Sequence, residues 1–163
     1  MNFKLARIAE AEARKNYHGN TVAAIGNLYP IASLFANEKD VTEASLDADW
    51  SGAFVYLCTS LAGLPIPPRY PDPRIGGSFT TALAWARYAR LPKIRLWHDA
   101  AEEPMVGDLV VIGQGEDKPL QIGIVLSVGE DALETAEGNY HNHSALVERK
   151  RDEHILGYIR LVN

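Results

Sequence analysis

The sequence holds a single cysteine, and this scarcity limits the chemistry that the chain can carry. Cys58 stands alone among 163 residues, which excludes a disulfide within the chain and a zinc site built from several cysteines. No apolar run approaches the roughly 20 residues that a membrane-spanning helix needs. The first twenty residues also lack the apolar core of a secretory signal. As given, the sequence indicates a cytoplasmic protein, although export without a signal and removal of a leader fit it equally well.

Positive charge is also scarce. The chain has 16 Lys and Arg against 21 Asp and Glu, a net charge of −5, and no block of basic residues. This balance disfavours a nucleic-acid partner, and the absence of a long apolar run disfavours membrane insertion. His141 and His143 stand close together but lack further ligands nearby in the sequence, so they indicate loop residues rather than a metal site. We expect no metal and no cofactor, and the oligomeric state stays open.

Apolar residues are plentiful enough for a real core. They make up 47% of the chain, a normal share for a globular protein of this length. Neither an internal repeat nor a domain boundary is visible. We therefore expect one domain over residues 1–163.

Helical patterns occupy the first half of the chain. Apolar residues recur at helical spacing over 3–17, a second helical piece covers about 20–37 with a break or kink at Pro30, and a third helix runs from about Asp49 to Gly63. Five prolines within 65–73 predict an irregular connection, which could line a groove but more simply crosses the surface. Residues 78–88 again favour a helix.

Short β-rich runs follow Pro104. They lie at 107–113, 121–128, 132–139, 144–150 and 155–162, separated by turn sequences such as GEDKP and GED. Their close spacing favours an antiparallel meander over parallel units with crossover helices. The sequence thus predicts an α+β fold, with N-terminal helices packed on an antiparallel sheet of five or six strands.

One stretch combines a helix start with a chemically capable side chain. In DADWSGAFVYLC, Ser51 stands at the beginning of a helix, where free backbone N–H groups and the helix dipole favour a nucleophile. Cys58 lies two turns further along, and we interpret it as a buried core thiol rather than a shifted nucleophile. Trp50 beside Ser51 fits a core position, a binding position or both.

An ordered set of segments resembles one enzyme family. DWSGAFVYLCTSLAGLPIP resembles the helix opening of the CHAP family of cysteine- and histidine-dependent amidohydrolases and peptidases, and of its NlpC-type relatives. Residues 78–85, GDLVVIG, QIGIVLSV, TAEGNYHNHSALVERKR and ILGYIR resemble later pieces of the same family, in the same order. The resemblance covers about residues 45–162 and leaves 1–44 as additional N-terminal helices. It implies a papain-like fold.

The sequence departs from this family where the chemistry occurs. Ser51 stands at the position of the catalytic cysteine, and Gln121 stands at the position of the histidine. The third, orienting position falls on Glu137 or Asn139, which otherwise fit a strand-end turn. A glutamine amide cannot take up a proton in the working pH range, and losing a general base typically removes about 10²–10⁴ in rate. The resemblance therefore implies a degenerate active site.

Strand alternation predicts how these positions meet. Gln121 and Gly123 share one face of a strand, and Glu137 shares a face with Thr135 on the next. We expect Ser51, Gln121 and Glu137 to form one polar cluster, with Gly123 allowing the helix of Ser51 to approach the sheet closely.

Three functional hypotheses remain. The first is a catalytically degenerate protein that binds a peptide or peptidoglycan fragment in the former active-site groove, with Trp50, Gly123, His141 and His143 as further binding positions. The second is an active cell-wall amidase or peptidase, which would use Ser51 with His141 or His143 as base, or a native cysteine that has been exchanged for Ser51. The third is a non-catalytic structural or interaction module, whose groove is filled by its own side chains.

Overall fold

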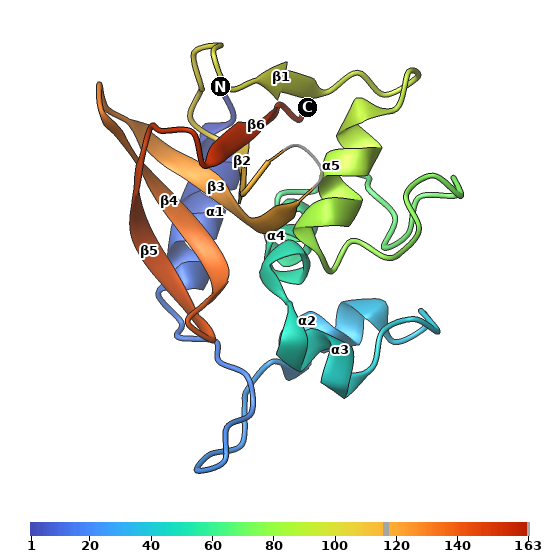
Figure 1. Ribbon diagram of the computed structural model, residues 1–163. Coiled ribbons are helices and arrows are strands. Elements are labelled where there is room, and N and C mark those ends of the chain that lie inside the picture. Colours follow the sequence, from blue (N-terminus) through green and yellow to red (C-terminus); the bar gives the residue numbers. More distant parts are fainter. Residues whose placement is uncertain (116–117, 163) are drawn as a thin grey trace.

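The computed structural model describes residues 1–115 and 118–162, and helices precede a sheet along the chain (Figure 1). The helices are α1 (Phe3–Ala13), α2 (Tyr29–Ala32), the 3₁₀-helix η1 (Ser33–Phe35), α3 (Glu43–Ala48), α4 (Ser51–Leu61) and α5 (Ala82–Arg90). The strands are β1 (Trp97–Asp99), β2 (Leu109–Gly113), β3 (Pro119–Val128), β4 (Ala132–Tyr140), β5 (His143–Lys150) and β6 (Ile155–Ile159). They form one antiparallel six-stranded sheet in the order β1-β6-β2-β3-β4-β5. The predicted α+β class and the antiparallel sheet are confirmed.

The two faces of the sheet carry different cores. Helices α1, α4 and α5 pack against β3, and α1 and α4 also contact β4. Side chains such as Ile122, Ile124 and Ala136 meet these helices in the main core. On the opposite face a smaller apolar cluster forms, which consists of Val110, Ile112, Val125, Leu133, Ile155 and Tyr158. The period-two alternation of a β-strand therefore decides which core each side chain joins.

Helix α4 lies at the centre of the main core. Every residue from Ser51 to Thr59 is buried, because the helix is apolar on nearly all sides and must be enclosed by other elements. The helix ends one residue before Ala62, and Gly63 then adopts a left-handed backbone with φ of 82°. The predicted helix between Asp49 and Gly63 is confirmed, with glycine in its usual terminating role.

The helix expected over 20–37 is wrong for most of its length. Residues 18–27 form a projecting loop that is closed by side-chain bonds to the backbone: Asn20 Oδ1 accepts from Gly26 N–H, and Asn27 Oδ1 accepts from His18 N–H, both at 2.7 Å. Asn and Thr side chains that bond nearby backbone groups compete with helix formation. Helical structure begins only at Tyr29, and Pro30 lies in the first turn of α2, where its missing N–H costs nothing.

Other boundaries shift by a few residues. Helix α1 ends at Ala13 rather than near residue 17, and α5 starts after Thr81, whose hydroxyl caps the Ala84 N–H at 3.2 Å. The short elements α3 and β1 were not predicted. The proline-rich stretch forms the expected irregular connection. The expected GEDKP turn includes residues 116–117, which lie outside the described residues.

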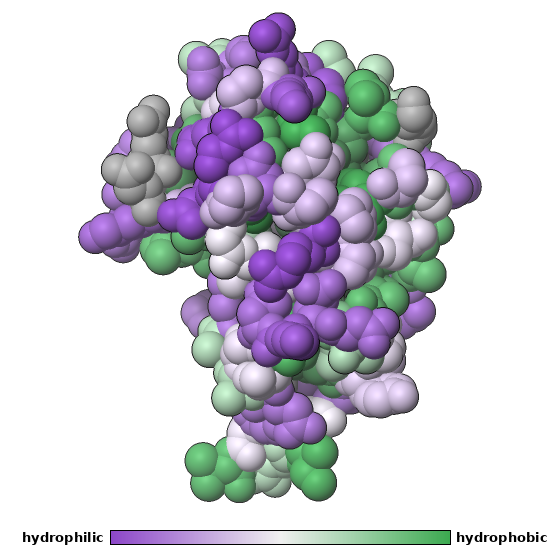
Figure 2. Space-filling view, turned by 90° about the vertical axis from the view of Figure 1, so that its right-hand side faces the viewer, coloured by the Kyte–Doolittle hydropathy of each residue, from purple (hydrophilic) through white to green (hydrophobic). Residues whose placement is uncertain are grey.

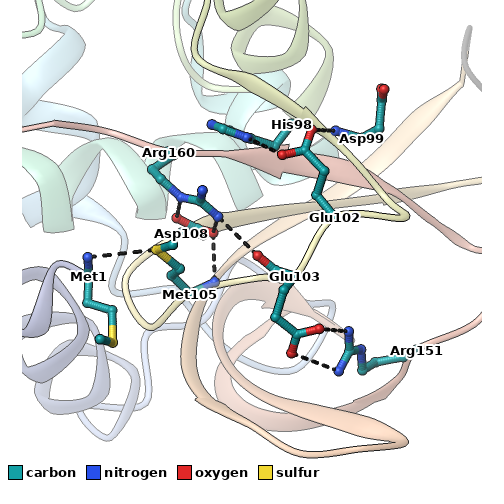
Figure 3. Close-up of polar contacts among 9 residues, drawn as sticks. All are labelled: Met1, His98, Asp99, Glu102, Glu103, Met105, Asp108, Arg151 and Arg160. Atoms are coloured by element: carbon teal, nitrogen blue, oxygen red, sulfur yellow. Dashed lines mark hydrogen bonds and ion pairs between the residues drawn. The ribbon is translucent and has the colours of Figure 1, made fainter.

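An ion-pair cluster fastens the segment before β2 to the C-terminal end of the chain (Figure 3). Buried Asp108 accepts two hydrogen bonds from Arg160, at 3.0 and 2.7 Å, and one from Met105 N–H at 2.8 Å. Arg151 makes a similar paired contact with Glu103. Asp108 was predicted to be part of a strand, but it lies in the connection that precedes β2.

Gly138 determines how closely α4 approaches β4. A Cβ atom at this position would lie 2.3 Å from Phe54 Cβ and 2.9 Å from the ring of Trp50. We expect Gly138→Ala to lower the free energy of unfolding by about 1–3 kcal/mol, because the added methyl group overpacks this interface. Urea denaturation would measure the change. Gly77→Ala is the matched control, since its Cβ would meet nothing closer than Asp40 at 3.5 Å; equal losses in both variants would contradict this explanation.

Candidate functional site

The start of α4 is held by an aspartate that the sequence analysis had passed over. Asp49 accepts hydrogen bonds from the Ser51 N–H at 3.2 Å and from the Ser51 hydroxyl at 3.1 Å. Asp49 has an extended backbone, so its side chain folds back over the first helical residue. An Asp placed two residues before a backbone N–H is a familiar turn-forming arrangement, which is the sequence signal for it. The Ser51 hydroxyl is therefore engaged by a neighbour within its own chain segment.

The first turn of α4 is also covered by the segment that leads into α5. A Cβ on Gly52 would lie 2.6–2.7 Å from the backbone of Thr80 and Thr81, and Ala53 N–H donates to Thr80 O at 3.1 Å. The indole of Trp85 donates to Gly52 O at 3.0 Å. Ser51 itself is 0% exposed, so a substrate could reach its hydroxyl only if neighbouring residues moved.

Burial changes the pKa of the Asp49 carboxyl. Desolvation raises the pKa of this carboxyl above its ordinary value, and the two hydrogen bonds from Ser51 oppose that rise only in part. The carboxylate is thus less favourable in the folded protein than in the unfolded chain. At neutral pH, the charge of Asp49 reduces the stability that its hydrogen bonds provide.

Gln121 belongs to a different polar network. Its amide nitrogen donates to Glu137 Oε2 at 3.0 Å and to Gly138 O at 2.8 Å. Glu137 is 0% exposed and also receives a two-pronged contact from Arg149, with Nε on Oε1 at 2.8 Å and a terminal nitrogen on Oε2 at 2.6 Å. The Thr135 hydroxyl donates to Oε1 at 2.7 Å. The carboxylate therefore accepts four hydrogen bonds.

Arg149 is the residue that makes this buried carboxylate tolerable. Its hydrogen bonds to Glu137 raise the pKa of the guanidinium, which is already charged at any relevant pH. Arg149 was not among the predicted site residues, because it lies in an ordinary-looking charged run. A signal was present: Arg149 shares a face of β5 with Val147, whose partner Thr135 shares a face of β4 with Glu137.

The expected cluster of Ser51, Gln121 and Glu137 does not form. The Gly138 contact with Phe54 shows which side of β4 faces α4, and Glu137, one residue earlier, points to the other face. Gln121 and Glu137 do meet, while Ser51 bonds Asp49 instead. Of the expected cluster, only the contact between Gln121 and Glu137 is observed.

The expected role of Gly123 also needs correction. A Cβ on Gly123 would lie 2.6 Å from the Glu137 side chain, so this glycine makes room for Glu137 and not for α4. The close approach of helix and sheet is provided instead by Gly138. Strand parity, which the sequence reveals, was insufficient because it does not say which face the helix covers.

The remaining predicted residues lie around the turn between β4 and β5. Trp50 is fully buried, and its indole nitrogen lies 3.4 Å from Asn142 Oδ1, so the turn does lie beside the start of α4. Asn139 and His141 adopt left-handed backbones, and the His141 ring lies against Tyr140. The exposed His143 contacts Asn16 at 3.2 Å.

Cys58 is a free thiol within the core, as the sequence analysis predicted. Burial raises the pKa of this thiol well above its ordinary value, which makes it a poor nucleophile. Among the described residues, no helix has the length and apolar character needed to cross a membrane.

Comparisons with models of protein families, with curated proteins and with solved structures found no match to this chain.

Breaking the buried ion pair should destabilise the protein strongly. We expect Arg149→Met to cost about 3–5 kcal/mol in the free energy of unfolding, because the Glu137 carboxylate loses its countercharge. The double variant Arg149→Met with Glu137→Leu should recover part of this loss, since both charges leave together. Urea denaturation of Arg149→Met, of Glu137→Leu and of the double variant gives the coupling energy. Purely additive losses would contradict a direct interaction.

Asp49 should affect stability in a pH-dependent manner. Asp49→Asn keeps an acceptor oxygen for Ser51 but removes the buried charge, so we expect it to be at least as stable as the parent at pH 7. Because the folded pKa of Asp49 is raised above its ordinary value of 3.8, the advantage should shrink as pH falls through the folded pKa and vanish below 3.8. Unfolding free energies over this pH range measure the effect.

Asp49→Ala serves as the control for the hydrogen bonds. It removes both charge and acceptor, and we expect it to lose about 1 kcal/mol. If Asp49→Asn were clearly less stable than the parent at pH 7, the carboxylate charge itself would be stabilising the helix start.

Proposed function

We propose that this chain is a catalytically inactive relative of the papain-like CHAP and NlpC-type enzymes and acts as a non-enzymatic interaction module. The observation that carries the proposal is the enclosure of Ser51, which is fully buried and bonded to Asp49. The helix-then-sheet order and the family-like segments support the papain-like relationship.

Hydrolysis of the family type requires a nucleophile and a base that face each other. Here the residue at the histidine position is an amide that cannot accept a proton, and its nitrogen is occupied by Glu137 and Gly138. Asp49 is close enough to Ser51 to accept its proton, but the same enclosure that raises the pKa of Asp49 keeps substrate away. An attacking group without access to substrate performs no turnover.

The alternatives find less support in the geometry. His141 is exposed and lies against Tyr140, His143 contacts Asn16, and the Ser51 hydroxyl bonds Asp49 rather than either histidine. A cysteine at position 51 would occupy the same enclosed place. A peptide or peptidoglycan fragment could not reach the buried Ser51 without moving the residues that enclose it, which favours an interaction surface elsewhere.

Installing the missing reactive groups tests the proposal. We expect Ser51→Cys with Gln121→His to leave peptidoglycan stem peptides uncleaved, because the new thiol is enclosed and the new imidazole faces Glu137. The thiol should react with an alkylating reagent orders of magnitude more slowly than an accessible one. Chromatography of the peptides and mass spectrometry of the alkylated protein provide the two readouts.

Two controls interpret the result. Ser33→Cys places a thiol at an exposed serine and sets the rate of free access, and Gln121→His alone reports the background of buried Cys58. Cleavage by the parent that disappears in Ser51→Ala, or rapid alkylation with a lowered thiol pKa in the double variant, would overturn the proposal.

A further inference from the structure

Two histidines from distant parts of the chain meet at the base of the loop at 18–27. The tip of this loop, residues 22–25, is apolar (Figure 2), and its polar side chains lie nearer the base. His18 begins the loop, and His143 begins β5. The two residues form an isolated antiparallel β-bridge, and their ring centroids lie 6.0 Å apart. The sequence offers no local signal for this pair, because its members stand far apart along the chain.

The backbone holds these two side chains close to each other. Ser144 N–H donates to Tyr17 O at 2.8 Å, and Gly19 N–H donates to Asn142 O at 3.3 Å. These bonds lie on either side of the histidine pair and not between its members. The pair is therefore of the non-hydrogen-bonded type, in which opposite Cα atoms lie only about 4.5 Å apart and the side chains share one face.

Each imidazole is oriented through its Nδ1 atom. His18 Nδ1 lies 3.3 Å from Gly19 O, and His143 Nδ1 lies 3.2 Å from Asn16 Oδ1. Because both partners are oxygen acceptors, each Nδ1 carries the proton and each Nε2 keeps its lone pair. Metal-binding histidines are normally held in this way, with one ring nitrogen bonded to an oxygen and the other available to the ion.

We propose that His18 and His143 form a binding site for a divalent transition-metal ion such as Zn²⁺ or Cu²⁺, with Nε2 of each ring as a ligand. Imidazole nitrogen is a preferred ligand of these ions, whereas Mg²⁺ and Ca²⁺ prefer oxygen. Two imidazoles that share an ion at about 2.0–2.1 Å have ring centroids about 5–6 Å apart, which is close to the observed 6.0 Å. This inference is independent of the proposed function.

The position of the pair determines what a bound ion does. His143 is exposed and His18 is half-buried, so an ion can reach both from solvent, and the net charge of −5 favours the approach of a cation. The pair supplies two ligands and leaves the other coordination positions to water, which makes binding weaker than in a structural zinc site with four protein ligands. Since the two histidines meet only in the folded chain, the ion ties the loop to the start of β5 and stabilises the folded state.

The first experiment measures metal binding by the full, untagged chain. Isothermal titration calorimetry should show a site that binds Cu²⁺ more tightly than Ni²⁺ or Zn²⁺ and does not bind Mg²⁺. His18→Gln and His143→Gln should each weaken the binding of Cu²⁺ by about tenfold or more, because only one imidazole remains.

Two further histidines provide matched controls. His154 is exposed and lies near two carboxylates that could hold an ion with it, and His141 is the sequence neighbour of His143. His154→Gln and His141→Asn should leave the affinity of the proposed site unchanged. Cu²⁺ binding that depends on either of these residues and not on His18 would overturn the inference.

The second experiment counts the ligands. Pulsed electron paramagnetic resonance of bound Cu²⁺ should detect two imidazoles in the parent and one in His18→Gln or His143→Gln. The thermal midpoint of the parent should rise when Zn²⁺ is added, whereas that of either variant should not. Equal midpoints of parent and variants in a chelator would show that the substitutions act on binding and not on folding.

The parent alone decides the outcome if a variant folds poorly. A parent that binds no Cu²⁺, a parent spectrum with fewer than two imidazoles, or a midpoint that Zn²⁺ leaves unchanged would each overturn the inference.

Discussion

The enclosure of α4 is the constraint on which the rest of the structure depends. A helix that is apolar on nearly every side gains stability only when other elements surround it, and here β3, β4, α1 and α5 do so. Gly138 and Gly52 permit the two closest approaches, to the sheet on one side and to the segment before α5 on the other. The same packing that stabilises the core leaves Ser51 fully buried, so one physical cause accounts for the stability of the helix and for the enclosure of this hydroxyl.

The polar residues at the positions singled out by the sequence resemblance are hydrogen-bonded within the protein. Glu137 is buried on the sheet face opposite α4, where an unpaired carboxylate would be costly, and Arg149, Thr135 and Gln121 supply all of its hydrogen bonds. Asp49 plays the corresponding part at the helix start by engaging both donors of Ser51. In both places a polar side chain of a type that can take part in catalysis is hydrogen-bonded to a neighbouring residue. Such satisfied networks rigidify a structure.

The loop at residues 18–27 differs from this hydrogen-bonded interior, because it exposes apolar side chains. Val22 and Ile25 are displayed on a loop that its own hydrogen bonds hold in place, next to an apolar cavity with an acidic border. Displaying aliphatic side chains in water gives no folding stability, whereas covering them in a complex does. The polar groups of the interior are thus hydrogen-bonded to one another, whereas the apolar side chains at 22–25 remain exposed to solvent.

The sequence by itself determined the α+β class, the antiparallel sheet, the central helix with Gly63 at its end, and the burial of Cys58, because hydrophobic periodicity and turn residues are local signals. It also predicted the contact between Gln121 and Glu137, which follows from strand parity. Three features were decided only by the tertiary structure: the face of the sheet that α4 covers, the pairing of Glu137 with Arg149, and the exposure of residues 22–25. The alternation of side chains along a strand shows which residues share a face, but it does not show which face the helix covers. An aliphatic run such as VAAI has the same composition in a core helix as on an exposed tip. Long-range packing alone distinguishes these cases.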